Sequence, residues 1–469
     1  MLNEYAQGHE ERAFVKVETT DGTNFGVVPA IATGDHVRLH GSFGIGRKEQ
    51  RRVSNDKRAN AAPVESQKGD AFTEWALGEG NARPPGALSA EPEFGALWYA
   101  LLGAKHVANA NSAVQAVPAP TVSGATVADA ASFFVGDLVR FSNGAGTGAH
   151  GLVRRIASKA ANALTWEPAL PAAPAAADVL KSGANYTCVA DPQVSLAMVR
   201  YLKHTAGVYA GLWVNEGSLK FSRADDLVAA FSGQGMGKGG RIGSTKLAGG
   251  INNLVTVLNV TANEGPQSDA ELGWYFTIDT EVFQLVSIAG AAWTVLRAQQ
   301  ASAAAAHLDL AEITPWVPTP TYTGRSLSGL LAYILIVDPV DGVQRAISLE
   351  NAEVKISNGF KPRREAGNGF AIGFLRGEPV RQVTVNMALP YKRLTNLLLD
   401  AARKKRQIGV VLRVGEDEGY IYAAVLPRVE LDPEGLPDAP EAGDTMITLT
   451  GSAFASSNSA EDQITIGTL

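Results

Sequence analysis

A glycine-rich run, GQGMGKGG at residues 233–240, contains the spacing GxGxxG that binds dinucleotides in some proteins. That motif requires a strand before it, a helix after it, and an acidic residue further on that binds the ribose. The residues that follow here, RIGSTKLAGG, add glycines and show no helical pattern of apolar residues. Lys238 also lacks the Ser or Thr that follows the lysine of a phosphate-binding loop. We interpret the run as a flexible linker, with a nucleotide site as the alternative.

Histidine and cysteine spacing gives little support for a metal or a nucleophile. His36 and His40 are four residues apart, but no glutamate lies between them as in an HExxH zinc site. We interpret them as surface histidines, with a metal site as the alternative. Cys188 is the only cysteine, which excludes an intrachain disulfide and a multi-thiolate site. Since no GxSxG motif occurs either, we expect no catalytic residue, no metal and no cofactor, and a protein that is not an enzyme.

Charged residues are grouped in a more informative way. A presumed loop near the N-terminus and a second one late in the chain are basic: Arg47, Lys48, Arg51 and Arg52, then Lys361, Arg363 and Arg364. A stretch near the C-terminus is acidic and includes Glu430, Asp432 and Glu434. Opposite charges on separate surfaces favour head-to-tail association of identical subunits. These ten residues are our candidates for contacts between subunits, and solvated loops are the alternative.

Composition limits the classes of protein to which the chain can belong. The chain has 469 residues, 45% hydrophobic and 19% charged, which is enough apolar material for several cores. Its 49 glycines and 23 prolines favour strands and turns over long helices. A net charge of -6 argues against binding nucleic acid through bulk positive charge. The most apolar run, Leu327–Val337, is shorter than the ~18 residues of a membrane span, and the first residues do not look like a signal peptide. We expect synthesis in a cytoplasm and no membrane partner.

Self-similarity along the chain predicts two large copies and two small β-modules. Each large copy has strands, a long loop, one helix and a closing set of strands. The predicted helices are Pro92–His106 and Tyr391–Lys405, and the hairpins that follow them are Ser195–Ser222 and Ile408–Asp432. Alternating side chains predict half-buried strands at Glu350–Ile356 and Arg381–Val385. The predicted units are residues 1–116 with 185–250, an inserted module at 117–184, a second module at 251–317, and residues 318–469. The predicted fold class is mainly β.

Three segments resemble the tail-tube proteins of long-tailed bacteriophages. They are the helix PEFGALWYALLGAKH, the hairpin GVYAGLWVNEGSLKFS, and the C-terminal GYIYAAVLPRVELD with MITLTGSAFAS. The resemblance implies two tandem tail-tube domains, each a β-sandwich or barrel with one flanking helix. It covers about two thirds of the chain and leaves out the two small modules, which would project outward or brace neighbouring subunits.

The resemblance also implies a structural role in the virion. Rings of this chain, homotrimers with pseudo-sixfold symmetry, would stack into a hollow tube. The tape-measure protein and the double-stranded DNA would occupy the lumen, and tail terminator and distal tail proteins would bind the ends. Two alternatives stay open: a distal tail or baseplate ring component, and a multidomain carbohydrate-binding or adhesin protein.

Overall fold

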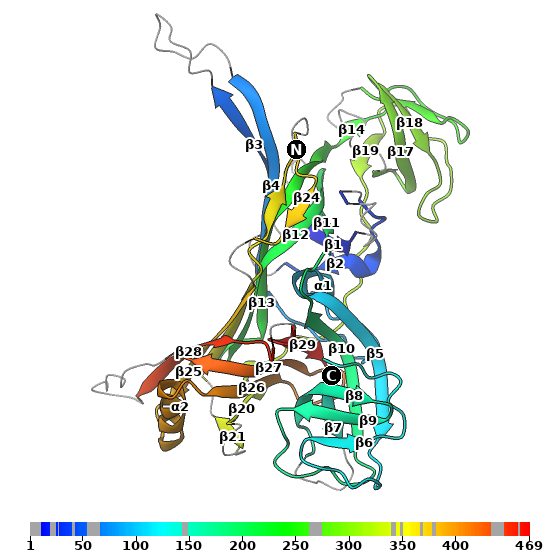
Figure 1. Ribbon diagram of the computed structural model, residues 1–469. Coiled ribbons are helices and arrows are strands. Elements are labelled where there is room, and N and C mark those ends of the chain that lie inside the picture. Colours follow the sequence, from blue (N-terminus) through cyan, green and yellow to red (C-terminus); the bar gives the residue numbers. More distant parts are fainter. Residues whose placement is uncertain are drawn as a thin grey trace, which may run out of the picture.

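The computed structural model describes most of the chain and shows a mainly β protein with two α-helices among the described residues (Figure 1). The described residues are 11–18, 25–26, 28–39, 43–53, 66–142, 149–261, 274–338, 344–347, 350–365, 369–377, 381–432, 445–457 and 460–469. Strands from both predicted large copies join one 21-stranded sheet. The predicted class, mainly β with few helices, is confirmed.

The N-terminal half forms an antiparallel sheet in the order β2-β1-β11-β12-β13-β4-β3. Two further long strands, β5 and β10, pair with each other and extend downward in Figure 1. The bounds are β1 (Glu11–Val17), β2 (His36–Val37), β3 (Phe43–Val53), β4 (Ser66–Asn81), β5 (Gly103–Ala113), β10 (Val179–Cys188), β11 (Leu196–Leu202), β12 (Thr205–Ser222) and β13 (Val228–Gly243).

The first helix, α1 (Gly95–Leu102), is shorter than the predicted Pro92–His106. Gly103 ends it with a φ of 98°, in the left-handed region that glycine adopts most easily. A Cβ at this position would lie 2.3 Å from a methyl carbon of Val189, so the turn also has no room for a side chain. The predicted helical residues beyond it, including His106, belong to β5. Trp98 of α1 is fully buried and packs edge to face on Phe231 at 4.7 Å.

The sequence predicted a linker at the glycine-rich run 233–240. This prediction is wrong, because the run is part of β13. The run pairs with β12 on one side, and its residues 233–235 also pair with β4 on the other side. A Cβ on Gly233 would lie 2.0 Å from the carbonyl oxygen of Trp213, and one on Gly235 would lie 2.3 Å from Leu212. The glycines therefore allow neighbouring strands and large side chains to approach the backbone closely. A nucleotide loop requires a helix after the glycines, and the chain continues as strand.

The C-terminal half has a second antiparallel set of strands, in the order β21-β20-β26-β27-β28-β25-β22. Alternating burial along β22 and β25 confirms the two strands predicted there. The bounds are β20 (Ala332–Val337), β21 (Gln344–Ile347), β22 (Asn351–Ser357), β23 (Lys361–Arg363), β24 (Gly373–Leu375), β25 (Gln382–Pro390), α2 (Arg393–Arg403), β26 (Gln407–Val414), β27 (Tyr422–Leu431), β28 (Met446–Ala453) and β29 (Thr465–Thr468).

The two halves are joined by backbone pairing and by a shared core. The ladder between β12 and β22 runs from Glu216 opposite Ser357 to Ser222 opposite Asn351. Strand β29 forms a second bridge, because it pairs with both β10 and β27. Buried side chains of both halves, such as Leu101 and Leu412, belong to one hydrophobic cluster. The relative orientation of the halves is therefore fixed by backbone and core together.

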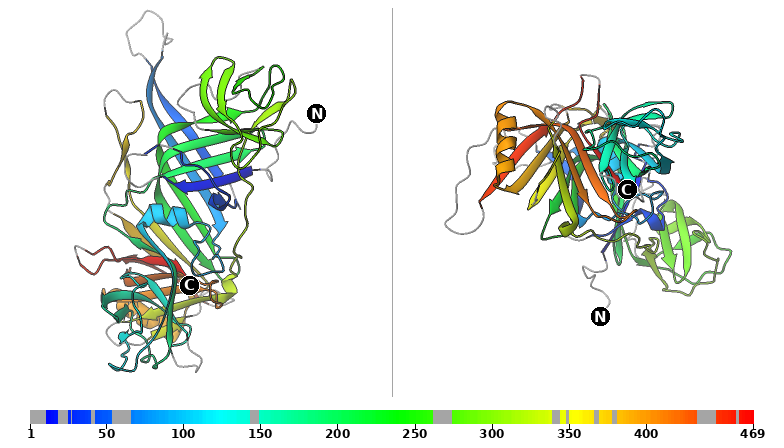
Figure 2. Two further views of the ribbon diagram at one scale, coloured as in Figure 1. Left: turned by 90° about the vertical axis from the view of Figure 1, so that its right-hand side faces the viewer. Right: turned by 90° about the horizontal axis from the view of Figure 1, so that it is seen from below.

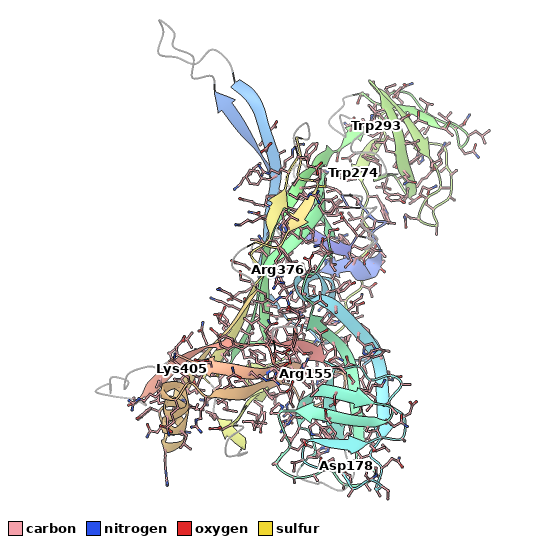
Figure 3. All side chains as sticks on the ribbon, in the orientation of Figure 1. Arg155, Asp178, Trp274, Trp293, Arg376 and Lys405 are labelled. Carbon is pink, nitrogen blue, oxygen red and sulfur yellow. The ribbon has the colours of Figure 1, made fainter. Side chains whose placement is uncertain are left out.

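The first small module, which we call module 1, continues the long strands β5 and β10 and has its own hydrophobic core. It also packs on the C-terminal half: Leu138 and Val153 share a cluster with Val411 and Val425. Arg155, which is labelled in Figure 3, bonds to Glu167 at 2.8 Å and to Thr465 of β29 at 3.2 Å. Its strands are β6 (Gly124–Thr126), β7 (Leu138–Ser142), β8 (Val153–Ala160) and β9 (Ala163–Glu167).

The second small module, module 2, has a separate six-stranded sheet and a separate core around Trp293 (Figure 3). It meets the N-terminal half at a small cluster in which Trp274 and Val317 pack near Phe14. In Figure 2 it stands away from the body at the same end as β3 and β4. Its strands are β14 (Thr245–Lys246), β15 (Val257–Asn259), β16 (Tyr275–Ile278), β17 (Glu281–Ala289), β18 (Ala292–Leu296) and β19 (Glu312–Pro315).

Candidate functional site

The first basic segment is a strand and not the presumed loop. Arg47, Lys48, Arg51 and Arg52 lie on β3, which pairs with β4 from Phe43 opposite Leu77 to Val53 opposite Ser66. Strand β4 pairs with β13 only from Thr73 onward. The outer part of the β3–β4 hairpin is therefore a two-stranded arm, which projects from the body in Figure 1. The side chains of Arg51 and Arg52 lie outside the described residues.

The second basic segment lies at the base of this arm. Lys361 and Arg363 are on β23, which pairs with β24, and Arg364 follows them. The Arg364 guanidinium is 2.5 Å from the Asp70 carboxylate on β4, and the Ala71 amide donates to the Gly369 carbonyl at 3.0 Å. The sequence assigned the two basic segments to separate copies, whereas the structure brings them side by side.

Aromatic contacts and ion pairs moderate the positive charge of this region. The Arg47 guanidinium lies 5.2 Å from the centre of the Phe370 ring. Lys48 pairs with Glu74 across the hairpin, and Arg363 pairs with Glu365 at 3.3 Å. These pairs are solvent-exposed, so each contributes at most about 1 kcal/mol to stability.

The acidic candidates lie at the other end of the molecule. Glu430 is half-buried on β27 opposite Gln407, which follows α2, and Asp432 is exposed just after β27. In Figure 1, α2 and β27 are at the bottom and the β3–β4 arm is at the top. Glu434 lies outside the described residues. The described basic and acidic candidates are thus separated along the long direction of the molecule.

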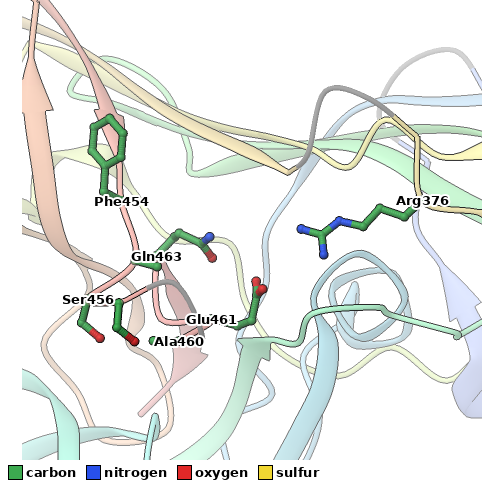
Figure 4. Close-up of a pocket in the computed structure, with 8 residues that line it drawn as sticks. Arg376, Phe454, Ser456, Ala460, Glu461 and Gln463 are labelled. Carbon is green, nitrogen blue, oxygen red and sulfur yellow. The ribbon is translucent and has the colours of Figure 1, made fainter.

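A pocket of about 650 Å³ opens between β24 and the C-terminal segment (Figure 4). Its lining includes Arg376, Phe454, Ser456, Glu461 and Gln463. Glu461 is 3.4 Å from the buried Arg381, so this carboxylate is ion-paired. Arg376 also donates to the Ala190 carbonyl at 2.6 Å and so ties β24 to the N-terminal half. The polar contacts here connect segments of the fold to one another.

Module 2 contains the most buried ionic network among the described residues. Glu281 is fully buried and accepts hydrogen bonds from Arg297 at 2.7 Å and His307 at 2.9 Å. Burial alone would raise the pKa of Glu281, but the bonds from Arg297, His307 and the amides of Ala305 and Ala298 lower it to about 2. A carboxylate held by this many donors is a structural anchor of the module.

The remaining chemical candidates are placed as follows. Within the described ranges, no three His, Cys, Asp or Glu side chains gather closely enough to hold a metal ion. His36 lies between the rings of Phe14 and Tyr322, each 5.4 Å away, and His40 is outside the described residues. Cys188 is buried, and burial raises the pKa of its thiol.

Sequence reasoning missed the Glu281 network and the contact between the two basic segments. Glu281, Arg297 and His307 have no characteristic spacing, because the residues meet only when β17, β18 and the loop after them fold together. The Arg364–Asp70 pair had no signal in the sequence either, since its partners are 294 positions apart.

Neither α-helix within the described residues is long and apolar enough to cross a membrane. No protein-family model matches the sequence, and no curated protein is similar to it at a significant level. The geometry described above is therefore the basis for any functional conclusion.

Proposed function

We propose that this chain is a structural subunit that associates head to tail into stacked rings and forms a hollow tube, the tail tube of a long-tailed bacteriophage. The observation that carries the proposal is the β3–β4 arm. The part of β4 before Thr73 pairs with β3 alone, and a two-stranded hairpin by itself is marginally stable in water. Contact with another subunit would supply the missing partner for its open edges.

Charge and architecture support the same proposal. The arm is basic at one end of the molecule, and Glu430 and Asp432 are at the other, so copies placed end to end bring opposite charges together. Two half-barrel units, each with one helix, sit in a fixed relation through the β12–β22 ladder. Such a pair suits a trimeric ring with pseudo-sixfold symmetry, in which each chain supplies two wall segments.

Further parts of the proposal follow from the tail-tube role. The lumen would hold the tape-measure protein and then double-stranded DNA, and terminator and distal tail proteins would bind the two ends of the tube. The virion tail would be the location of the chain after synthesis in the host cytoplasm. The role requires no cofactor, no catalytic residue and no membrane partner.

Negative-stain electron microscopy of the purified chain at several concentrations tests the proposal. We expect rings with a central hole that stack into tubes. A variant in which residues 51–68 are replaced by a two-residue Asn-Gly turn should fold and form rings but fail to stack. Tubes of unchanged length from this variant would rule out the arm as the stacking element. Rings that never stack in the unaltered chain would favour a distal tail component, and particles without a hole would favour a carbohydrate-binding or adhesin protein.

A further inference from the structure

Negative charge is concentrated in one small part of the chain. Residues 251–317, which form most of module 2, contain seven acidic residues and one basic residue, Arg297. Their net charge of -6 equals that of the whole chain, so the other residues carry 40 acidic and 40 basic side chains. Arg297 is buried against Glu281, and the exposed charges among the described residues of 251–317 are acidic: Asp279, Asp309 and Glu312. Lys246 of β14, which precedes this segment, is an exposed basic residue of the module.

Module 2 also exposes large aliphatic side chains. Leu254 and Leu308 are 80% and 82% exposed, and Leu296 is exposed as well. Hydrogen bonds place the three in one neighbourhood: Arg297, next to Leu296, donates to the carbonyls of Asn252 and Val255 on either side of Leu254. Ile251 pairs with His307, the residue before Leu308. We call Leu254, Leu296 and Leu308 the module 2 surface. Grouped exposed aliphatic side chains are typical of an interaction site.

A surface of complementary character lies on β23, β24 and β3. Because Lys361 is directly opposite Leu375, these two side chains and Arg363 share one exposed face of the β23–β24 ladder. The other face carries Phe374, which stacks on Trp213 at 5.2 Å and fixes the ladder to the body. Exposed Phe370 and Arg47 lie beside it. We call Arg47, Lys361, Arg363, Phe370 and Leu375 the hairpin surface.

The hairpin surface is strongly basic. Strand β3 and residues 359–377 together contain eight basic and two acidic side chains. Two of the eight, Lys48 and Arg364, pair with Glu74 and Asp70 of β4. The hairpin surface thus has exposed apolar groups in a region of net positive charge. The module 2 surface has exposed apolar groups in a region of net negative charge.

We propose that the module 2 surface of one copy of this chain docks on the hairpin surface of the neighbouring copy in the same ring. The left view of Figure 2 shows module 2 and the β23–β24 segment at the same end of the molecule, on opposite sides. Since the two segments lie on opposite sides of one chain, a contact between them joins two copies. Two different patches on opposite sides make a heterologous contact, which closes into a ring when the rotation between copies allows it.

This contact rests on the proposed function, because it supposes that copies associate side by side. Apolar side chains supply the buried area, and the opposite charges favour this pairing over two like surfaces. Helix α2 and the turn after it, in which Figure 3 labels Lys405, form a second basic element, but it is at the far end of the molecule from module 2. Because this basic element is far from module 2, substitutions in it provide a control for the charge substitutions on the hairpin surface.

A charge-swap experiment with the full chain tests the contact. One variant, Lys361→Glu with Arg363→Glu, makes the hairpin surface acidic. The other, Leu254→Lys with Leu308→Lys, makes the module 2 surface basic. Each alone places like charges together and should weaken association at least tenfold in sedimentation velocity. A chain that carries all four substitutions should restore association to within about threefold of the unaltered chain, because every contact in the ring is again between opposite charges.

Matched controls separate docking from folding. Val117→Lys in module 1 changes a side chain that is 81% exposed, and Arg403→Glu with Lys405→Glu reverses two exposed charges at the end of α2 and in the turn after it. Neither should change side-by-side association more than twofold. Because all the substituted side chains are exposed, the far-UV circular dichroism and the unfolding midpoint should stay unchanged in every variant.

The outcomes distinguish the contact from the proposed function. Normal association of either double variant, no rescue in the chain with all four substitutions, or an unaltered chain that stays monomeric would overturn the contact. Tubes that form despite both variants would overturn the contact and leave the tail-tube proposal standing. Oligomers that lose association in each double variant, regain it in the chain with all four substitutions and yet never form a tube would establish the contact and contradict the tail-tube proposal.

Discussion

Arg364 and Asp70, which are 294 positions apart in the sequence, form an ion pair of 2.5 Å that joins the segment after β23 to the base of the β3–β4 arm. Beside it the Ala71 amide donates to the Gly369 carbonyl at 3.0 Å. The two basic segments of the chain are thus one surface. A partner that contacts one segment is positioned to contact the other.

Removal of this pair should affect assembly more than stability. Both side chains are about one third exposed, so Arg364→Ala should lower the free energy of unfolding by less than about 1 kcal/mol. Urea unfolding measures this value, and the exposed pair Lys404–Asp400 on α2 provides the control Lys404→Ala. A loss above about 2 kcal/mol would mean that the pair holds the fold together. In that case its role in a contact surface could not be separated from folding.

The sequence predicted classes of element better than their ends and contacts. Strands β22 and β25 were predictable because their side chains alternate between core and solvent. The helix at 92–106 was predicted too long because apolar spacing does not reveal that Gly103 adopts a left-handed φ. The basic segment at Arg47 was interpreted as a loop because strands of an exposed arm lack an apolar face. Contacts such as Arg364–Asp70 depend on tertiary structure alone.

Two glycines with positive φ differ in the space available for a Cβ atom. Gly103 has a φ of 98° and no space for a Cβ, whereas Gly249 has a φ of 88° and nothing within 4 Å of an added Cβ. Gly249→Ala should cost about 1 to 2 kcal/mol of unfolding free energy from backbone strain alone. Gly103→Ala should cost about 1 to 3 kcal/mol more, because Val189 and Pro192 must move. Chemical denaturation of the two variants compares them, and equal losses would contradict the crowding at Gly103.

Module 1 should depend on one carboxylate for its attachment to the C-terminal half. Glu167 lies between two arginines, 2.8 Å from Arg155 and 2.9 Å from Arg428 of β27. The Arg155 side chain is only 8% exposed, so Glu167→Gln removes the carboxylate bonded to a nearly buried cation and leaves it only the nearby charge of Asp462. We expect a loss of about 2 to 4 kcal/mol in unfolding free energy.

An exposed pair between the same parts of the molecule gives the matched control. Lys181 of β10 and Glu418 are 2.5 Å apart, and the Glu418 side chain is nearly half exposed. Glu418→Gln should therefore cost less than about 1 kcal/mol. If both glutamine variants unfold at the same urea concentration as the unaltered chain, the apolar cluster of Leu138, Val153 and Val411 alone holds module 1 in place.

His36 should make stability depend on pH below neutrality. Burial, and then the nearby charges of Arg38 and Arg12, lower the pKa of His36 from 6.5 to about 4. The unfolded chain therefore binds more protons than the folded chain between these values, so stability falls as the pH decreases from about 6.5 to 4. His36→Gln should flatten this part of a plot of unfolding free energy against pH, because the glutamine side chain does not bind a proton in this range. An unchanged slope in the His36 variant would mean that other groups cause the acid sensitivity. The burial of His36 between Phe14 and Tyr322 would then not contribute to the pH dependence of stability.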